Sequence, residues 1–458
     1  MTTFPKTAII GAGSSGIAAL KALHERGLEV DCFEASDRVG GNWVFENVNG
    51  MSSAYRTLHI NTSRARMEYA DFPMPQSYPD FPHHTQMAAY FDAYVDHFGV
   101  RERIRFRTAV ERAVRSPDGG WTLTADGEER RYDALVVANG HHWDERWPEP
   151  AFPGADEFAG EQIHAHGYKH EDQLRGRKVV VVGMGNSAMD IAVDASYHAQ
   201  QTVLAARRGA WVLPKYIQGK PVDRKRALLT NPRVPWKIRQ LIAQLTLLAT
   251  SGPMENYGLP KPDHRFGEAH PTISGRILDR LAHGAITTRP NIARLHRHEV
   301  EFTDGSRVEA DLVVYCTGYK VTFPFFEESF ISAPDNHIEL FRRVFHPGIP
   351  EVAFIGLLQP LGAIMPLAEA QGQWVAAYLR GEYHLPPREA MMIGIRRDFA
   401  RMAKRYVASK RHTIQVDFDD YLHEMARERR AGEARARQAG FALPVAPRVA
   451  EGQESLAA

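Results

Sequence analysis

The sequence predicts an α/β protein with two Rossmann-like dinucleotide-binding domains, the second inserted into the first. Two glycine loops lead to this prediction, and each follows a run of apolar residues typical of a buried parallel strand. The loop at 11–16 has the spacing GxGxxG, and the loop at 183–188 has the spacing GxGxxA. Such glycines let the backbone approach a pyrophosphate, while the following helix offers N–H groups and a partial positive charge. Two loops therefore indicate two nucleotide cofactors with electron transfer between them.

The first unit opens with a predicted strand over 7–10, a helix over 17–24 and a second strand over 28–33. Glu34 follows that strand, 23 positions after Gly11 (34 − 11). A carboxylate at this place suits the two hydroxyls of an adenosine ribose, and a solvated glutamate at a strand end is the alternative. The residues expected at the phosphates are Gly11, Gly13, Ser15 and Gly16.

Two further segments of the first unit are candidate ligand contacts. Gly41, the second of two adjacent glycines, precedes Asn42 and Trp43 and allows close backbone approach to a flat ligand, although a plain turn would use the same residues. Asn61 and Thr62 lie in a polar segment, where an asparagine usually caps a turn or a helix.

The rest of the first unit contains a predicted helix over 86–98, a hairpin turn at 119–120 and a buried strand over 134–138. The proline-rich stretch 148–153 predicts a domain boundary, so the first part of the first domain is expected to cover 1–153.

The second unit repeats the pattern with a valine strand over 178–182 and a strand over 202–206. Ala206 stands where Glu34 stands in the first unit, so the ribose acid is missing, and Arg207 and Arg208 follow it. A guanidinium pairs well with a phosphate, which a carboxylate would repel. This contrast predicts FAD on the first loop and NADPH on the second, with two solvated arginines as the alternative. The second loop would contribute Gly183, Gly185, Asn186 and Ser187.

The later chain is expected to return to the first domain. The NADPH-binding domain would cover 154–310 and contain a Lys-, Arg- and Pro-rich insertion at about 213–275, with a packing helix over 238–250. A buried strand over 311–315 would begin the second part of the FAD-binding domain, which would run from 311 to 431. Residues 432–458 have few large apolar groups and predict a flexible tail.

Composition narrows the class of protein further. The formal net charge is +1 over 458 residues, which argues against nucleic acid and acidic membrane surfaces as partners. The chain has two cysteines, Cys32 and Cys316, which fits a reducing compartment. We expect no signal peptide and no membrane anchor, because the first strand begins within a few residues and the helix over 238–250 is short and polar in part. The expected location is cytoplasmic.

An ordered series of motifs identifies a resemblance. Phe158, Gly160, His164 and Tyr168 form an FxGxxxHxxxY pattern ahead of the second glycine loop. Together with the two loops, the chain resembles the flavin-containing monooxygenases, of the soluble bacterial type, over about residues 5–430. The family usually has Ala where this chain has Cys316. Further matching segments are Gly40–Trp43, Asn61–Thr62, Asp71–Pro75, Arg207 with Gly209–Trp211, Cys316–Tyr319 and Gln359–Gly362.

The resemblance implies FAD and NADPH as cofactors and O2 with a small amine or sulfide as substrates. It places Asn61 at the flavin and nicotinamide as the catalytic residue, Gln359 at the cofactors, and a 4a-hydroperoxyflavin as the oxygenating species. The oxygen transfer itself would then need no acid–base side chain. No metal site is expected, because the histidines at 141, 142, 164 and 166 lack cysteine partners and a HExxH pattern. A homodimer is one of the oligomeric states left open.

Two other classes of enzyme remain as alternatives. Baeyer–Villiger monooxygenases, which oxidise ketones, carry Trp where this chain has Tyr168. Disulfide reductases and flavin electron carriers share the two-nucleotide architecture, but disulfide chemistry needs a redox cysteine pair, and this chain has no CxxC.

Overall fold

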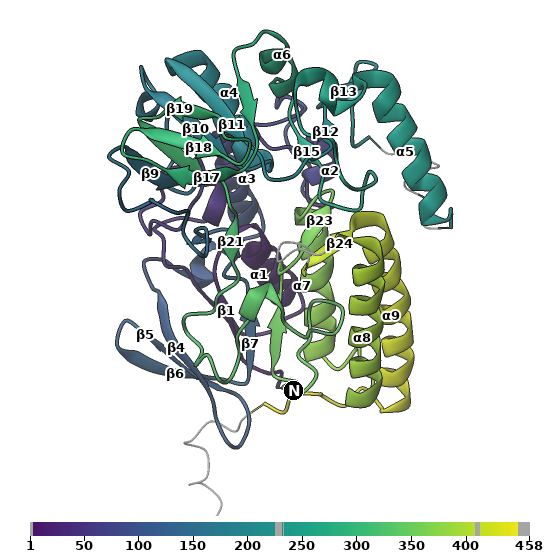
Figure 1. Ribbon diagram of the computed structural model, residues 1–458. Helices are drawn as coiled ribbons and strands as arrows, with labels where there is room; N and C mark the ends of the chain where they lie inside the picture. Colours follow the sequence, from purple (N-terminus) through teal and green to yellow (C-terminus); the bar gives the residue numbers. More distant parts are fainter. Residues whose placement is uncertain (1–2, 225–230, 232, 408–412, 448–458) are drawn as a thin grey trace, which may run out of the picture.

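The computed structural model describes residues 3–224, 231, 233–407 and 413–447. Within these residues the fold is built on two five-stranded parallel sheets, and the predicted α/β class with two Rossmann-like domains is confirmed (Figure 1). The first sheet has the order β22-β7-β1-β2-β3. Its strands are β1 (Thr7–Ile10), β2 (Val30–Phe33), β3 (Ile104–Arg105), β7 (Ala134–Val137) and β22 (Val352–Phe354).

Helices cover the first sheet because its strands are apolar on both faces. Helix α1 (Ser14–Glu25) follows the first glycine loop and packs along α7 (Met365–Leu379), as Figure 1 shows near the centre of the molecule. The other elements of this part are α2 (Arg64–Met67), α3 (His84–His97) and an antiparallel sheet of β4 (Val110–Arg115), β5 (Trp121–Ala125) and β6 (Glu128–Tyr132). The predicted hairpin turn at 119–120 joins β4 to β5.

The second sheet has the order β16-β11-β10-β20-β9. Its strands are β9 (Glu161–His164), β10 (Lys178–Val182), β11 (Gln201–Ala205), β16 (Thr287–Arg289) and β20 (Leu312–Tyr315). Helix α4 (Asn186–His198) connects β10 to β11 after the second glycine loop. A small antiparallel sheet consists of β17 (Ile292–Leu295), β18 (Glu299–Phe302) and β19 (Arg307–Glu309).

Strand β20 corrects one expected boundary. We expected residues 311–315 to begin the second part of the first domain, but β20 pairs with β10 on one side and with β9 on the other. The second domain therefore extends through Tyr315. The segment that returns to the first domain runs beside the segment that left it, because β21 (Tyr319–Lys320) pairs antiparallel with β8 (Asp144–Glu145).

The insertion contains short strands and one long helix. The strands are β12 (Val212–Leu213), β13 (Tyr216–Ile217), β14 (Lys220–Pro221) and β15 (Thr272–Ile273), the long helix is α5 (Trp236–Ser251), and α6 (Ile277–Ala282) follows the insertion. The packing helix expected over 238–250 is α5, but part of its apolar surface is not covered: Ile238, Leu241 and Leu245 are 50%, 58% and 56% exposed. The buried residues of α5 are Leu247 and two polar ones, Arg239 and Gln240. In Figure 1, α5 lies at the outer edge of the molecule.

The chain after β22 forms β23 (Gln359–Leu361), α7, α8 (Arg388–Arg405), β24 (Gln415–Asp417) and α9 (Phe418–Gln438). The expected flexible tail from residue 432 is wrong for its first part, since α9 continues to Gln438. Gly432 is packed so tightly that a Cβ there would lie 1.9 Å from the Tyr383 ring, and Ala436 is fully buried. Residues 448–458 of the expected tail lie outside the described residues.

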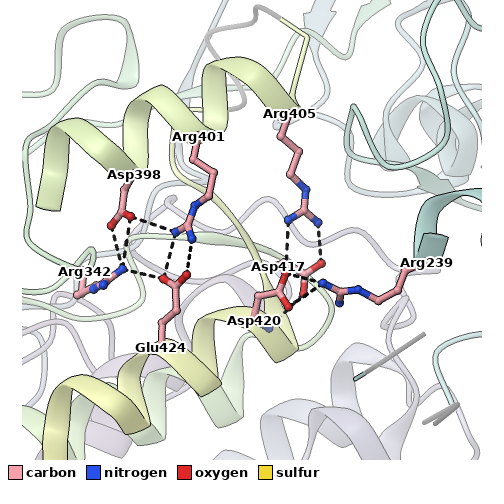
Figure 2. A network of polar contacts seen from close by, with 8 residues as sticks. All are labelled: Arg239, Arg342, Asp398, Arg401, Arg405, Asp417, Asp420 and Glu424. Atoms are coloured by element: carbon pink, nitrogen blue, oxygen red, sulfur yellow. Dashed lines mark hydrogen bonds and ion pairs between the residues drawn. The ribbon is translucent and has the colours of Figure 1, made fainter. Parts of the chain in front are cut away.

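An ion-pair network joins α5 to the C-terminal helices (Figure 2). Arg239 of α5 donates two hydrogen bonds of 2.9 Å to the two carboxylate oxygens of Asp420 on α9, and its side chain is 6% exposed. Arg405 of α8 bonds Asp417 at 2.8 Å and lies 3.5 Å from Asp420. The network thus ties the insertion of the second domain to the first domain. Figure 2 also shows a second group of ion pairs beside the first, formed by Arg342, Asp398, Arg401 and Glu424.

In the described ranges, no helix combines the length and the hydropathy needed to cross a lipid bilayer.

Candidate functional site

Both glycine loops open into one continuous cavity of about 2010 Å³. This exceeds the roughly 300–1,000 Å³ typical of a site for one small molecule, so the volume suits two dinucleotides and a substrate. The carboxyl ends of β1 and β10 both reach it, as ligand sites of doubly wound sheets do. All predicted site residues line the cavity except Gly16: Gly11, Gly13, Ser15, Glu34, Gly41, Asn42, Trp43, Asn61, Thr62, Gly183, Gly185, Asn186, Ser187, Arg207, Arg208 and Gln359.

The first glycine loop has the shape of a phosphate cradle. A Cβ at Gly16 would lie 1.8 Å from the carbonyl oxygen of Gly11, so this glycine lets α1 pack against the end of β1. A Cβ at Gly13 would meet only Gly41 Cα, at 3.8 Å, on the wall of the cavity. Gly13 therefore leaves space for a ligand, whereas Gly16 allows α1 to pack closely against the end of β1.

Glu34 lies at the end of β2 and is 5% exposed. Its two carboxylate oxygens accept hydrogen bonds from the backbone N–H groups of Ala12, at 2.7 Å, and Ser36, at 2.8 Å. Burial raises the pKa of Glu34 above its ordinary value, and these two bonds oppose the shift. Each carboxylate oxygen has further acceptor capacity, so the group fits the two hydroxyls of a ribose.

The turn at 40–43 faces the first loop. Gly41 begins a short 3₁₀ helix (Gly41–Trp43) and has a left-handed φ of 54°. The Asn42 side chain accepts bonds of 2.8 Å from both the backbone N–H and the hydroxyl of Ser53. Asn42 therefore also braces the following loop.

The second glycine loop is held by the insertion. Asn186, the first residue of α4, accepts a 2.9 Å bond from the N–H of Ile273 in β15. The Thr272 hydroxyl donates to the carbonyl of Met184 at 2.5 Å. The N-terminus of α4 points its N–H groups into the cavity region lined by Gly185 and Ser187, which fits a pyrophosphate.

The two arginines after β11 have different surroundings. Arg208 donates a 2.6 Å bond to Asp263, and that pair lies in solvent. Arg207 is exposed at the cavity rim and makes no hydrogen bond or ion pair to another described residue. Arg207 is thus the guanidinium that is available for a ligand phosphate.

Asn61 lies in an irregular segment before α2 and lines the same cavity as the two glycine loops. Its Oδ1 atom is buried and accepts no hydrogen bond from any residue that the structure describes. A buried acceptor without a donor is rare in a folded protein, and a ligand N–H group would satisfy it. Asn61 and Thr62 line the cavity, in agreement with their predicted position.

Helix α4 holds the segment that contains Asn61. Tyr55 donates a 2.5 Å bond to Asp190, and Thr57 donates a 2.6 Å bond to Asp194, one turn later on α4. Burial raises the pKa of Asp190 to about 6, and the bond from Tyr55 opposes this shift. The helix that begins at the second loop therefore contacts the Asn61 segment directly.

The fingerprint residues support these contacts from behind. Tyr168 donates a 2.9 Å bond to Asp194, and its ring lies 5.7 Å from that of Tyr55. The His164 ring lies 5.2 Å from Tyr319, where the chain crosses back to the first domain. His164 thus lies where the two domains are linked.

Our sequence analysis missed Tyr55, Asp190 and Asp194. One signal was available, because two aspartates four residues apart on a helix share a face. Their partners lie more than a hundred residues away, so the pattern could not identify what that face contacts.

Comparison with known proteins gives a consistent result. A sequence model of the FMO-like family, described as flavin-binding monooxygenase-like, matches residues 5–433. Flavin-containing monooxygenase 5 of Rattus norvegicus is 37% identical over 445 residues, covering 92% of this chain and 82% of that protein. Dimethylaniline monooxygenase (N-oxide-forming) 2 of Macaca mulatta is 35% identical over 446 residues, with the same coverage of 92% and 82%. The solved structure of S-allyl-L-cysteine S-oxygenase from Allium sativum aligns with a TM-score of 0.69 and 25% identity, covering 95% of this chain and 92% of that one.

Proposed function

The chain belongs to the flavin-binding monooxygenase-like family, and from this membership we propose which residues hold its cofactors and which substrates it oxygenates. It is an oxidoreductase that uses FAD, NADPH and O2. The observation that carries the proposal is one shared cavity that both glycine loops line together with Asn61, whose Oδ1 atom has no donor among the described residues.

We assign FAD to the first loop. Gly11, Gly13 and Ser15 would face its pyrophosphate, and Glu34 would accept hydrogen bonds from its adenosine ribose. The turn at 41–43 and Gln359 line the cavity beyond them, where the ring system would lie. When bound, FAD supplies the redox chemistry, taking electrons from NADPH and passing them to O2.

We assign NADPH to the second loop. The N-terminus of α4, with Asn186 and Ser187, would hold its pyrophosphate. Arg207 would bind the 2′-phosphate, because Arg208 is already paired with Asp263 and Ala206 offers no carboxylate to repel it.

Asn61 would position the nicotinamide relative to the flavin, since its free acceptor oxygen can take an amide N–H. The protein's remaining task is to exclude water and orient the substrate, and no general acid or base is assigned.

The substrates we propose are soft nucleophiles, namely tertiary amines and sulfides. The names of two relatives support this class, one an N-oxide-forming enzyme and the other an S-oxygenase.

An oxygen-consumption assay with product analysis tests the proposal. The purified enzyme with FAD and NADPH is given trimethylamine, methyl phenyl sulfide or cyclohexanone in parallel. We expect an N-oxide or a sulfoxide with one O2 consumed per NADPH. A lactone from the ketone, with no N-oxide or sulfoxide, would assign the enzyme to Baeyer–Villiger chemistry, and NADPH oxidation without O2 uptake would assign it to electron transfer.

A further inference from the structure

The backbone on both sides of Asn61 is held from the other domain. The carbonyl of Ile60 accepts a 3.1 Å bond from Lys215, and the N–H of Ser63 donates a 2.6 Å bond to Asp223. Lys215 immediately precedes β13, and Asp223 lies two residues after the end of β14 (Lys220–Pro221). The two side chains therefore extend from the same end of one small hairpin, opposite its turn.

A backbone hydrogen bond holds the two strands together at this end, because the N–H of Val222 donates a 2.9 Å bond to the carbonyl of Lys215. Lys215, before β13, thus donates from its ammonium group to the Ile60 carbonyl. Asp223, after β14, accepts from the Ser63 N–H group with its carboxylate. Bonds to charged groups are roughly twice as strong as bonds between neutral groups. The segment 60–63 is therefore gripped at both ends.

Backbone bonds from its own domain also flank Asn61. Ile60 donates to the carbonyl of Pro82 and His84 donates to the carbonyl of Leu58, both at 3.0 Å, and Arg64 donates to the carbonyl of Asp80 at 2.7 Å. The hairpin therefore adds one bond on each side of Asn61 to those of its own domain.

Lys215 acts from behind the cavity wall, since it is half-buried and is not among the cavity-lining residues. Its ammonium group lies 4.9 Å from the centre of the Phe81 ring. Asp190 attracts this charge, and Arg276 repels it. Lys215 therefore acts on oxygen transfer through the residues that it holds, whereas Asp223 itself lines the cavity.

We propose that Lys215 and Asp223 are positioning residues that hold Asn61 in place, and that they set the fraction of NADPH oxidation that yields oxygenated product. The proposal rests on the function proposed above. A displaced Asn61 would leave NADPH oxidation intact but release reduced oxygen as hydrogen peroxide.

The test compares Lys215→Met, Lys215→Arg and Asp223→Ala with Tyr216→Phe. Tyr216 is the matched control, because it lies in the same hairpin and its hydroxyl bonds the side chain of Asp80 at 2.9 Å, not the backbone carbonyl of Asp80 that accepts the bond from Arg64. Each FAD-loaded variant is examined in two ways. Hydrogen exchange measures opening of residues 55–67, and a peroxide assay measures the uncoupled fraction of NADPH consumed with a sulfide substrate.

Losing a charge-assisted bond of roughly 1.5–3 kcal/mol corresponds to about 10- to 150-fold faster exchange in Lys215→Met and Asp223→Ala. We expect the peroxide fraction to rise several-fold in both, to fall back in Lys215→Arg, and to stay at the wild-type value in Tyr216→Phe. The rate of NADPH oxidation should change less than twofold.

Unchanged exchange, unchanged coupling, or equal effects in Tyr216→Phe would each overturn the proposal. If Lys215→Met does not fold, the Lys215→Arg and Asp223→Ala variants decide it. A wild-type enzyme that oxygenates no amine or sulfide would refute the proposed function instead, and the exchange measurement would still test the hairpin.

Discussion

Two alanine substitutions in the first glycine loop should have opposite effects. In Gly16→Ala the new Cβ would lie 1.8 Å from the Gly11 carbonyl oxygen and 2.8 Å from its carbon. Carbon–oxygen contacts normally begin near about 3.3 Å, so α1 would have to move from β1 by more than about 1 Å. Because both clashing partners are backbone, we expect a cost at or above the usual ~1–3 kcal/mol of overpacking.

In Gly13→Ala the new Cβ would have Gly41 Cα as its nearest neighbour, at 3.8 Å, which is ordinary contact. Gly13 has φ −69° and ψ −178°, a conformation open to any residue, so folding should change by no more than about 0.5 kcal/mol. The methyl group would instead stand between the loop and the proposed pyrophosphate. We expect FAD affinity to fall at least tenfold, which is about 1.4 kcal/mol.

The assay has two parts, thermal unfolding of the flavin-free protein and titration with FAD followed by flavin fluorescence. A loss of ~3 kcal/mol should lower the Tm of Gly16→Ala by about 6–12 °C, taking ~2–4 °C per kcal/mol for domains of 150–250 residues. Gly13→Ala should keep the wild-type Tm. If Gly13→Ala binds FAD as tightly as the wild type, the first loop is not the flavin site.

Three further predictions follow from the site. Arg207→Ala should lower kcat/KM for NADPH about 10- to 30-fold and leave NADH unchanged, since one exposed charge-assisted contact is lost; Arg208→Ala should change either value less than threefold, and equal losses for both cofactors would refute the assignment. Asn61→Ala should retain FAD and consume NADPH but convert most of it to hydrogen peroxide; wild-type coupling would make Asn61 an ordinary turn residue. Burial raises the pKa of Asp190 to about 6, so the folded protein pays for a buried charge fully above that pH and progressively less below it. Between pH 7 and 5 the wild type should therefore gain about 1 kcal/mol of stability relative to Asp190→Asn in urea unfolding, and parallel pH curves would contradict this.

Much of the site was visible in the sequence because its parts are local. A glycine loop with its strand and helix occupies about 30 residues, and Glu34 is fixed by counting along the same unit. Strand β20 shows the limit of this reasoning. A four-residue apolar strand suits either sheet, and only its pairing with β10 decides, which no local pattern contains.

Helix α5 shows a second limit. Its existence was predicted, but Ile238, Leu241 and Leu245 face outward, while Arg239 and Gln240 find long-range partners on the inner side, Asp420 and the Phe266 carbonyl. A prediction from hydrophobic periodicity assumes that the apolar face of a helix is the buried one. Polar residues with distant hydrogen-bond partners can be buried instead, and the pattern does not show those partners.

The extent of α9 was missed for a different reason. The residues after 432 are mostly small or charged, which we took as a sign of disorder, yet Ala, Arg and Glu are good helix formers. Tyr421, Met425, Gly432 and Ala436 recur at helical spacing and are buried. Their periodicity would have predicted the helix, although the composition suggested disorder.

In the ion-pair network of Figure 2, the contact between the insertion and the C-terminal helices should tolerate loss of an arginine better than loss of the shared aspartate. Asp420 serves two guanidinium groups, those of Arg239 and Arg405. Loss of Arg239 leaves the Asp420 carboxylate paired with Arg405. Loss of Asp420 leaves the buried Arg239 guanidinium without its carboxylate, a change that typically lowers stability by about 3–5 kcal/mol. During evolution Arg239 or Arg405 could therefore be substituted singly in this contact. A substitution of Asp420 would require substitutions of both arginines as well.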